Sequence, residues 1–295
     1  MEFFSPLTVL VFLMLYGCGT LLIREARVRW GLQWSVVFLS AAYGIIEEGL
    51  CVKSFFNPGW VDMGALSAYG MFLGVQWPWT ISLIVYHGIM STLVPILIVD
   101  MLFPQNADRP LVGRKGIVIA LLCITFLTVW GMTYFGTVIG GVMVPFNAHP
   151  ALMIGGLASV LALIWLAHRF RRSRIASSSH IVSPWVFGVF GGDFMFANLL
   201  IPDTMARMGI DSSIAILSQL VLIGLAALFV KSQLLNERAT KRHTAGLVTG
   251  IILMFVLLTP IMELNGGRHM VLTGAVTLLL LIAWRRNVLN NNVLL

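Results

Sequence analysis

The stretch 32-LQWSVVFLSAAYGIIEEGLCVKSF-55 decides the class of fold, because it is an apolar run long enough to cross a bilayer. A transmembrane helix needs about 20 mostly apolar residues to cross about 30 Å of hydrocarbon. Similar runs recur along the 295 residues, of which 58% are hydrophobic and only 11% are charged. Soluble domains carry about 25% charged residues. The chain is therefore predicted to be an all-α, polytopic transmembrane helical bundle, with a mean hydropathy of +0.92.

The apolar runs predict about nine spans within a single integral membrane domain that covers residues 1–295. They lie at about 4–23, 32–55, 79–103, 117–136, 151–167, 184–201, 214–230, 245–261 and 270–284. The first run has no basic segment before it and no small-residue cleavage site after it, so it is expected to be a retained span.

Lys and Arg are distributed unequally between alternate loops. One set of loops holds 16 of them, whereas the other set holds only Arg207 and Arg268. Because cytoplasmic loops are rich in Lys and Arg, this split predicts the N-terminus outside and the C-terminus in the cytoplasm. Residues 285–295 then form a short cytoplasmic tail. The net charge of +7 is explained by topology and by contact with anionic lipid, without nucleic acid.

The loop at 56–78 is expected on the outer side and is unusually aromatic. It carries Phe56, Trp60, Tyr69, Phe72 and Trp77. Such residues favour the membrane interface. This segment is therefore predicted to be an interfacial loop or a lid.

Glu47, Glu48 and His87 are ionisable residues inside predicted spans. Each costs about 2.5–3.5 kcal/mol on insertion scales, so such residues point to a functional site. Glu48 and His87 each lie about eight residues from the outer ends of consecutive spans, which places both roughly 12 Å deep. Consecutive spans are usually neighbours. A meeting of glutamate and histidine is therefore expected.

A helical projection puts one polar stripe on the second span and turns Glu48 about 100° away from it. The stripe consists of Ser40, Tyr43, Glu47, Cys51 and Ser54. The two carboxylates are thus expected to diverge, so that Glu48 needs a partner of its own. His87 and Ser91 share one face of the next span. At least one of the two acids is expected to be neutral at pH 7, which suits a proton carrier, an acid–base catalyst or a buried hydrogen bond between helices.

Three further residues could extend a substrate path from this site. Asp193 lies in 188-GVFGGDFMFAN-198, whose glycines allow close helix packing that would bury the acid. Glu263 and His269 belong to 263-ELNGGRH-269, at a predicted outer mouth. A helix contact for Asp193 and a plain turn for the other two are the structural alternatives.

Two adjacent glutamates on one span and a histidine on the next resemble the CAAX-protease and bacteriocin-processing (CPBP) family of intramembrane peptidases. In that family a diglutamate activates water, with histidines from later spans. The resemblance covers about 50 residues and implies that Glu47, Glu48 and His87 fill these positions. The family patterns are EExxxR, FxxxH and HxxxN. Here 47-EEGLCVK-53 places Lys53 one position late, 83-LIVYH-87 begins with leucine, and no HxxxN follows.

Three classes of function remain open. The first is a transporter or proton/cation-coupled carrier that binds its ion at Glu47, Glu48 and His87. The second is an intramembrane hydrolase in which a glutamate activates water. The third is a non-catalytic assembly subunit whose acids pair helices.

The sequence identifies no cofactor, no oligomeric state and, with one well-placed histidine, no metal site. The expected partners are membrane lipid and a small ion or hydrophobic substrate, and no nucleic acid is expected. The three cysteines show no disulfide framework, which favours a prokaryotic cytoplasmic membrane.

Overall fold

The computed structural model describes residues 5–172, 180–234, 236 and 238–290, and the chain forms two compact units. The first unit comprises Met1–Ile96, Asp108–Ser173 and Leu200–Leu220. The second unit comprises Leu97–Ala107, Arg174–Leu199 and Val221–Leu295. Each unit is built from helices that are continuously apolar, and such helices satisfy their own backbone hydrogen bonds in a bilayer.

Several helices are continuous rods that contain a π-helical turn, in which hydrogen bonds span five residues. In chain order the helices are α1 (Pro6–Phe12), η2 (Leu13–Gly17), α2 (Cys18–Trp30), α3 (Val36–Gly44), η3 (Ile45–Cys51), η4 (Gly64–Leu66), α4 (Trp77–Tyr86), η5 (His87–Leu93), α5 (Val94–Leu102), η6 (Pro104–Asn106), α6 (Arg114–Tyr134), α7 (Pro150–Arg169), α8 (Pro184–Arg207), α9 (Ser212–Phe229), η7 (Val230–Leu234), α10 (Lys241–Leu264) and α11 (Met270–Asn290). Two small hairpins pair β1 (Met71–Phe72) with β2 (Val75–Gln76), and β3 (Gly136–Ile139) with β4 (Val142–Pro145).

Eight helices within the described residues are long and apolar enough to cross a membrane. The prediction of an all-α polytopic membrane protein is thus confirmed. The second predicted span, 32–55, is not among these eight, because it is helical only over α3 and η3, from Val36 to Cys51. Lys53 ends this helix, because its backbone adopts the left-handed conformation (φ 65°), which no helix can continue.

The short helix α3–η3 nevertheless connects the two ends of the first unit. At one end, Arg29 donates a hydrogen bond to the Val112 carbonyl, just before α6 begins. At the other end, Thr137 Oγ1 donates to Asn57 Oδ1 at 3.3 Å, just after α6 ends. Since α6 has 21 residues, about 30 Å of helix separates these contacts. The chain therefore crosses the unit between residues 31 and 57.

Basic segments gather at the first of these ends. Arg24 donates to the Arg109 carbonyl at 3.2 Å, and the Trp30 ring lies edge-on to His168 with centroids 5.5 Å apart. Glu25 is buried among them and pairs with Arg29 at 3.0 Å. The loops that the sequence assigns to one side thus lie together within this unit.

The predicted outer loop or lid, 56–78, is a compact segment with a buried interior. It contains the 3-10 turn η4 and the β1–β2 hairpin, whereas the sequence suggested no strand there. Gln76 is fully buried; its side-chain oxygen accepts from Ala68 N–H at 2.8 Å and its amide donates to the Ser54 carbonyl at 3.2 Å. These bonds hold the loop directly onto the end of η3.

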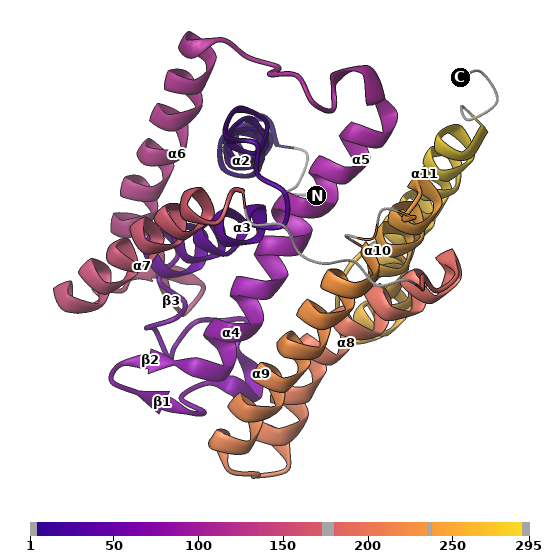
Figure 1. Cartoon of the computed structure of the whole chain (residues 1–295). Helices are drawn as coiled ribbons and strands as arrows, with labels where there is room; N and C mark the ends of the chain where they lie inside the picture. Colours follow the sequence, from indigo (N-terminus) through magenta and orange to yellow (C-terminus); the bar gives the residue numbers. More distant parts are fainter. Residues whose placement is uncertain (1–4, 173–179, 235, 237, 291–295) are drawn as a thin grey trace. The chain divides into compact units, whose positions relative to one another are not determined.

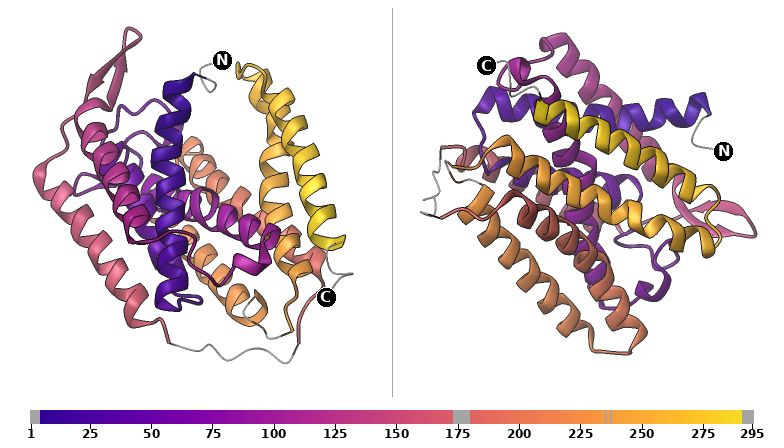
Figure 2. Two further views of the ribbon diagram at one scale, coloured as in Figure 1. Left: turned by 90° about the horizontal axis from the view of Figure 1, so that it is seen from above. Right: turned by 90° about the vertical axis from the view of Figure 1, so that its right-hand side faces the viewer.

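The second unit is organised around a close helix pair. α10 and α11 run side by side, as both Figure 1 and Figure 2 show. The first part of α8 packs on α10 through glycines: a Cβ atom at Gly192 would lie 3.0 Å from the Gly250 carbonyl, and one at Gly250 would overlap the Gly188 carbonyl. Small residues at such positions let membrane helices approach closely.

Candidate functional site

Three π-helical turns supply the main polar side chains of the candidate site. In each turn the backbone N–H that follows it reaches back five residues: Cys18 to Leu13, Val52 to Glu47, and Val94 to Ile89. The turn η2 carries Tyr16, η3 carries both glutamates, and η5 begins at His87. π-helical turns are rare and are often found at functional sites.

His87 lies between the two glutamates. Its Nδ1 atom is 2.9 Å from Glu47 Oε2, and its Nε2 atom is 3.0 Å from Glu48 Oε1. The Glu47 side chain is 2% exposed, that of His87 8% and that of Glu48 12%. The structure therefore brings together the three residues that the sequence selected. The expectation that Glu48 needs a partner of its own, apart from that of Glu47, is not met. The two carboxylates converge on His87, with one oxygen of each within 4.8 Å of the other, and each faces a different nitrogen of the imidazole.

The second oxygen of Glu48 accepts a hydrogen bond from the segment that follows η3. The Ser54 hydroxyl donates a short hydrogen bond to Glu48 Oε2, and Trp79 Nε1–H donates to Ser54 Oγ at 3.0 Å. Ser54 is fully buried. A continuous series of polar contacts thus runs from Trp79 through Ser54 and Glu48 to His87. Both oxygens of Glu48 therefore have a polar neighbour, Ser54 on one side and His87 on the other.

Glu47 is held less completely. The Nδ1 atom of His87 also lies 3.1 Å from Ser91 Oγ. Although Nδ1 is close to Glu47 Oε2, this oxygen is buried without an aligned hydrogen bond from the described residues. One acceptor of Glu47 is therefore open to a proton, a water or a ligand.

Close packing of two helices makes the contact possible. A Cβ atom at Gly44 would lie 3.0 Å from Ile84 Cα, and one at Gly88 would lie 3.3 Å from the Ser40 carbonyl. Glycine at both positions lets α3–η3 and α4–η5 approach at backbone distance. The histidine ring then fits between two consecutive residues of the facing helix.

Tyrosines surround the carboxylates. Tyr16, Tyr43 and Tyr86 all lie close to Glu47. Tyr43, which the sequence placed on the polar stripe, is 2% exposed, and a side chain at Gly19 would overlap its ring. Its hydroxyl has no aligned partner among the described residues. Tyr86 lies edge-on to His87 with ring centroids 4.9 Å apart.

Sequence reasoning missed Tyr16, Trp79 and Tyr86 as parts of this site. Tyr86 and Trp79 are on the histidine's own helix, so helical spacing around His87 could have suggested them. Tyr16 comes from the first span, and no local pattern links it to the glutamates. Ser54 was placed by helical spacing on the stripe of Glu47, but it follows the end of η3 and contacts Glu48 instead.

Lys53 does not extend toward the membrane surface. It is 2% exposed, and its ammonium donates to the Met132 carbonyl in the last turn of α6. Carbonyls in the last turn of a helix lack partners within it, so the lysine stabilises the end of α6. It does not pair with a glutamate in the structure.

The donor set also fits a cation. One ligand atom from each of Glu47, Glu48 and His87 lies within 4.8 Å of the others. Carboxylate and imidazole are common ligands of divalent metals. The site can thus bind a proton or a cation, and it can serve as an acid–base pair.

The three remaining predicted residues belong to the second unit. Asp193 is exposed on α8, so the expectation that the glycines bury it is wrong: they pack on α10, and Asp193 lies off that face. Glu263 accepts from Val271 N–H at 2.6 Å, and the His269 carbonyl accepts from Thr273 Oγ1 at 2.9 Å. Both residues join α10 to α11, as the turn alternative proposed.

Fold and site together define an all-α, multi-pass integral membrane protein. The chain belongs to an uncharacterised membrane protein family, whose model matches residues 1–288. No curated protein and no solved structure matches it. The family match does not connect the chain to the CPBP peptidases, so the resemblance of Glu47, Glu48 and His87 to their motifs stays a hypothesis.

Proposed function

We propose that this membrane protein is a proton- or cation-coupled carrier and that Glu47, His87 and Glu48 are its ion-binding site. One observation carries the proposal: the imidazole contacts a different carboxylate through each of its nitrogens. Chains of acidic residues and histidines inside membranes are typical of proton relays.

The geometry allows a balanced proton transfer. A neutral His87 that carries its proton on Nε2 can accept a proton at Nδ1 from the Glu47 carboxyl group. It can then release the Nε2 proton to the Glu48 carboxylate. One proton enters the ring and one leaves it, and the net result is transfer from Glu47 to Glu48.

The contacts beyond Glu48 support a route toward the loop side. Glu48 is hydrogen-bonded to Ser54, which follows η3 and contacts the buried Gln76 through its carbonyl. The sequence assigns this side to the exterior. We therefore infer that protons or cations exchange with the outer solution through the loop at 52–76.

The test is ion flux in liposomes that contain the purified protein and a pH-sensitive dye. A potassium gradient with valinomycin sets the membrane potential. Wild-type protein should acidify the lumen faster than protein-free liposomes. Glu48→Gln and His87→Asn should each slow the flux by at least about tenfold, a barrier increase of about 1.4 kcal/mol.

Asp108→Asn is the matched control, because it removes one carboxylate charge from an exposed position outside the loop at 52–76. Its flux should equal that of the wild type. Equal flux for Glu48→Gln and wild-type protein, with both reconstituted to the same level, would reject the carrier.

A second candidate function is intramembrane hydrolysis. It is favoured by the buried Glu47 oxygen that has no aligned hydrogen bond, since a general base needs a free acceptor for the proton of water. Hydrophobic peptides incubated with the protein in detergent would then be cut, as read by mass spectrometry. Glu47→Gln should slow cleavage by about 10²–10⁴-fold. Cleavage that Glu47→Gln leaves unchanged would exclude this role.

A further inference from the structure

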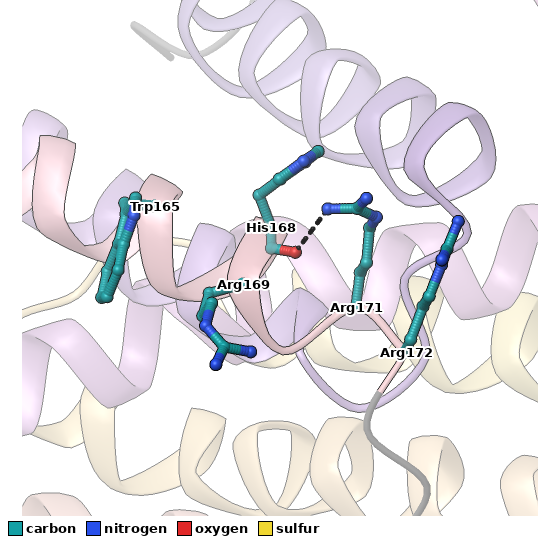
Figure 3. Close-up of a pocket in the computed structure, with 5 residues that line it drawn as sticks. All are labelled: Trp165, His168, Arg169, Arg171 and Arg172. Atoms are coloured by element: carbon teal, nitrogen blue, oxygen red, sulfur yellow. Dashed lines mark hydrogen bonds between the residues drawn. The ribbon is translucent and has the colours of Figure 1, made fainter.

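A second polar cluster lies at the basic end of the first unit, at the last turn of α7. Trp165, His168, Arg169, Arg171 and Arg172 line a pocket of about 330 Å³ (Figure 3). The ion-binding proposal does not use any of these residues. Three guanidinium groups and one imidazole lie at a single helix end. Such a cluster of hydrogen-bond donors is suited to bind an anion.

The pocket is held by contacts with neighbouring helices. The His168 ring packs edge-on against Trp30 of α2. Phe170 packs between Trp34 and Phe38, with ring centroids 5.9 Å and 6.2 Å from it. The chain beyond α7 is thus fixed against α2 and α3, and the arginines project from an anchored turn.

Stabilisation of the C-terminal end of α7 does not by itself account for three arginines and a histidine. The C-terminus of a helix carries a partial negative charge and free carbonyls, which one or two basic residues can satisfy. Arg171 serves this purpose, because its Nη1 donates to the His168 carbonyl at 3.0 Å. Each guanidinium has five N–H donors. Within the described part of the chain, Arg169, Arg171 and Arg172 make no ion pair with a carboxylate.

The residues around the pocket are typical of a membrane interface. α7 is one of the helices long and apolar enough to cross a membrane, and it ends at Arg169. Trp165, one turn earlier, is 62% exposed. Exposed tryptophan beside arginine is typical of the headgroup level, where the ring lies among lipid and the cation meets phosphate. Planar guanidinium groups bind phosphate through paired hydrogen bonds.

From this arrangement we infer that the pocket binds the phosphate group of an anionic phospholipid. His168, Arg171 and Arg172 contact the phosphate, and Trp165 packs along the acyl chain. The site holds one lipid at a defined place on the basic end of α7, in addition to the general attraction of basic loops for an anionic surface.

The experiment titrates detergent-purified protein with phosphatidylglycerol or phosphatidylcholine of the same acyl chains and counts bound lipids by native mass spectrometry. Wild-type protein should bind one phosphatidylglycerol at least about tenfold more tightly than phosphatidylcholine. The Arg171→Gln/Arg172→Gln double variant should lose this preference. The Arg285→Gln/Arg286→Gln variant, which removes the same charge from the exposed end of α11, should keep it.

Three outcomes would overturn the site. The first is that wild-type protein shows no preference for phosphatidylglycerol. The second is that both double variants lose this preference equally, which would mean that net positive charge, and not a defined site, attracts the lipid. The third is inorganic phosphate that binds as tightly as the lipid, which indicates a soluble anion as the ligand. If the Gln variant unfolds, Arg171→Lys/Arg172→Lys replaces it. Lysine keeps the charge but cannot form paired hydrogen bonds, so an intermediate loss of binding is expected.

Discussion

At the scale of single residues, the His87 imidazole explains how two adjacent glutamates can share a site. Consecutive residues on a helix point in different directions, about 100° apart in an α-helix. An imidazole has two nitrogens on different edges of its ring. Glu47 and Glu48 leave the helix in different directions, yet their carboxylates converge to within 4.8 Å and each faces a different nitrogen of one histidine.

Ser54 is predicted to be a positioning residue for Glu48. Ser54→Ala removes a hydrogen bond to Glu48 and leaves Trp79 Nε1–H without its acceptor. Unsatisfied buried polar groups cost about 1–3 kcal/mol each, so thermal unfolding in detergent should shift to a clearly lower temperature.

Ser67→Ala is the control for this prediction, because Ser67 is an exposed loop serine that donates to the Pro58 carbonyl at 2.6 Å. Its effect should stay within about 0.5 kcal/mol, as is usual for surface substitutions. Equal unfolding temperatures for Ser54→Ala and wild-type protein would show that Ser54 does not hold Glu48.

The residues that meet at the site are only partly predictable from the sequence. Depth along consecutive spans predicts that Glu48 and His87 lie at one level, and spacing on one helix predicts that Ser91 lies beside His87. Tyr16 cannot be predicted in this way, because it reaches the site through packing of the first span. Helical spacing predicts Ser54 beside Glu47, but its contact with Glu48 depends on the turn that follows η3. Asp193 was expected to be buried and is exposed. The glycines around it predict that the helix packs closely against another helix, but they do not predict which face of the helix is packed.

At the scale of elements, glycine sets the distance between the two helices that carry the site. Gly44→Val is predicted to push α3 away from α4, because even a Cβ atom would lie 3.0 Å from Ile84 Cα. Overpacking of this kind costs about 1–3 kcal/mol. The variant should unfold at a lower temperature and lose ion flux in the liposome assay.

Gly155→Val is the matched control on α7, since a Cβ atom there meets nothing within 4 Å. It should keep both stability and flux. If Gly44→Val kept wild-type flux, the close approach of α3 and α4 would be unnecessary for the site.

The glycine contact of α8 with α10 gives a separate prediction in the second unit. Gly250→Ala places a methyl group into the Gly188 carbonyl, so it should destabilise the protein by about 1–3 kcal/mol. Gly224→Ala on α9 meets open space and should stabilise the helix by about 0.5–1 kcal/mol. Opposite shifts in unfolding temperature are therefore expected; shifts of the same sign would contradict the packing.

The elements themselves differ in how well the sequence predicts them. Long apolar runs predict eight of the helices because length and composition alone decide them. The end of α3–η3 at Cys51 is not predicted, because it depends on the left-handed backbone of Lys53 and on its contact with α6. The two hairpins are short and contain no alternating pattern long enough to detect.

At the scale of the whole molecule, the distribution of charge predicts the orientation in the membrane. Basic segments from three loops lie together at one end of the first unit, around Arg24, Arg29 and His168. A fluorescent protein that folds only in the cytoplasm should fluoresce when fused to the C-terminus. A phosphatase that is active only outside should be active when inserted between Gly140 and Gly141.

Insertion of the phosphatase at Gly113 is the control, since this residue lies next to the basic end and should give an inactive enzyme. Activity at Gly113 together with inactivity at Gly140 would reverse the predicted orientation. Activity at both positions would mean that α6 does not cross the membrane.

The three π-helical turns have a consequence for how such a protein can change. A π-helical turn holds one residue more than the α-helical turn that it replaces. Removing one residue from the start of η3 would restore a regular helix. The helix on either side would keep its register, whereas the glutamates inside the turn would change direction. The carboxylates would then leave the imidazole although no polar side chain had been altered. Loss or gain of this site along a lineage could thus occur through a three-nucleotide deletion or insertion, an event that a search for substituted glutamates would overlook.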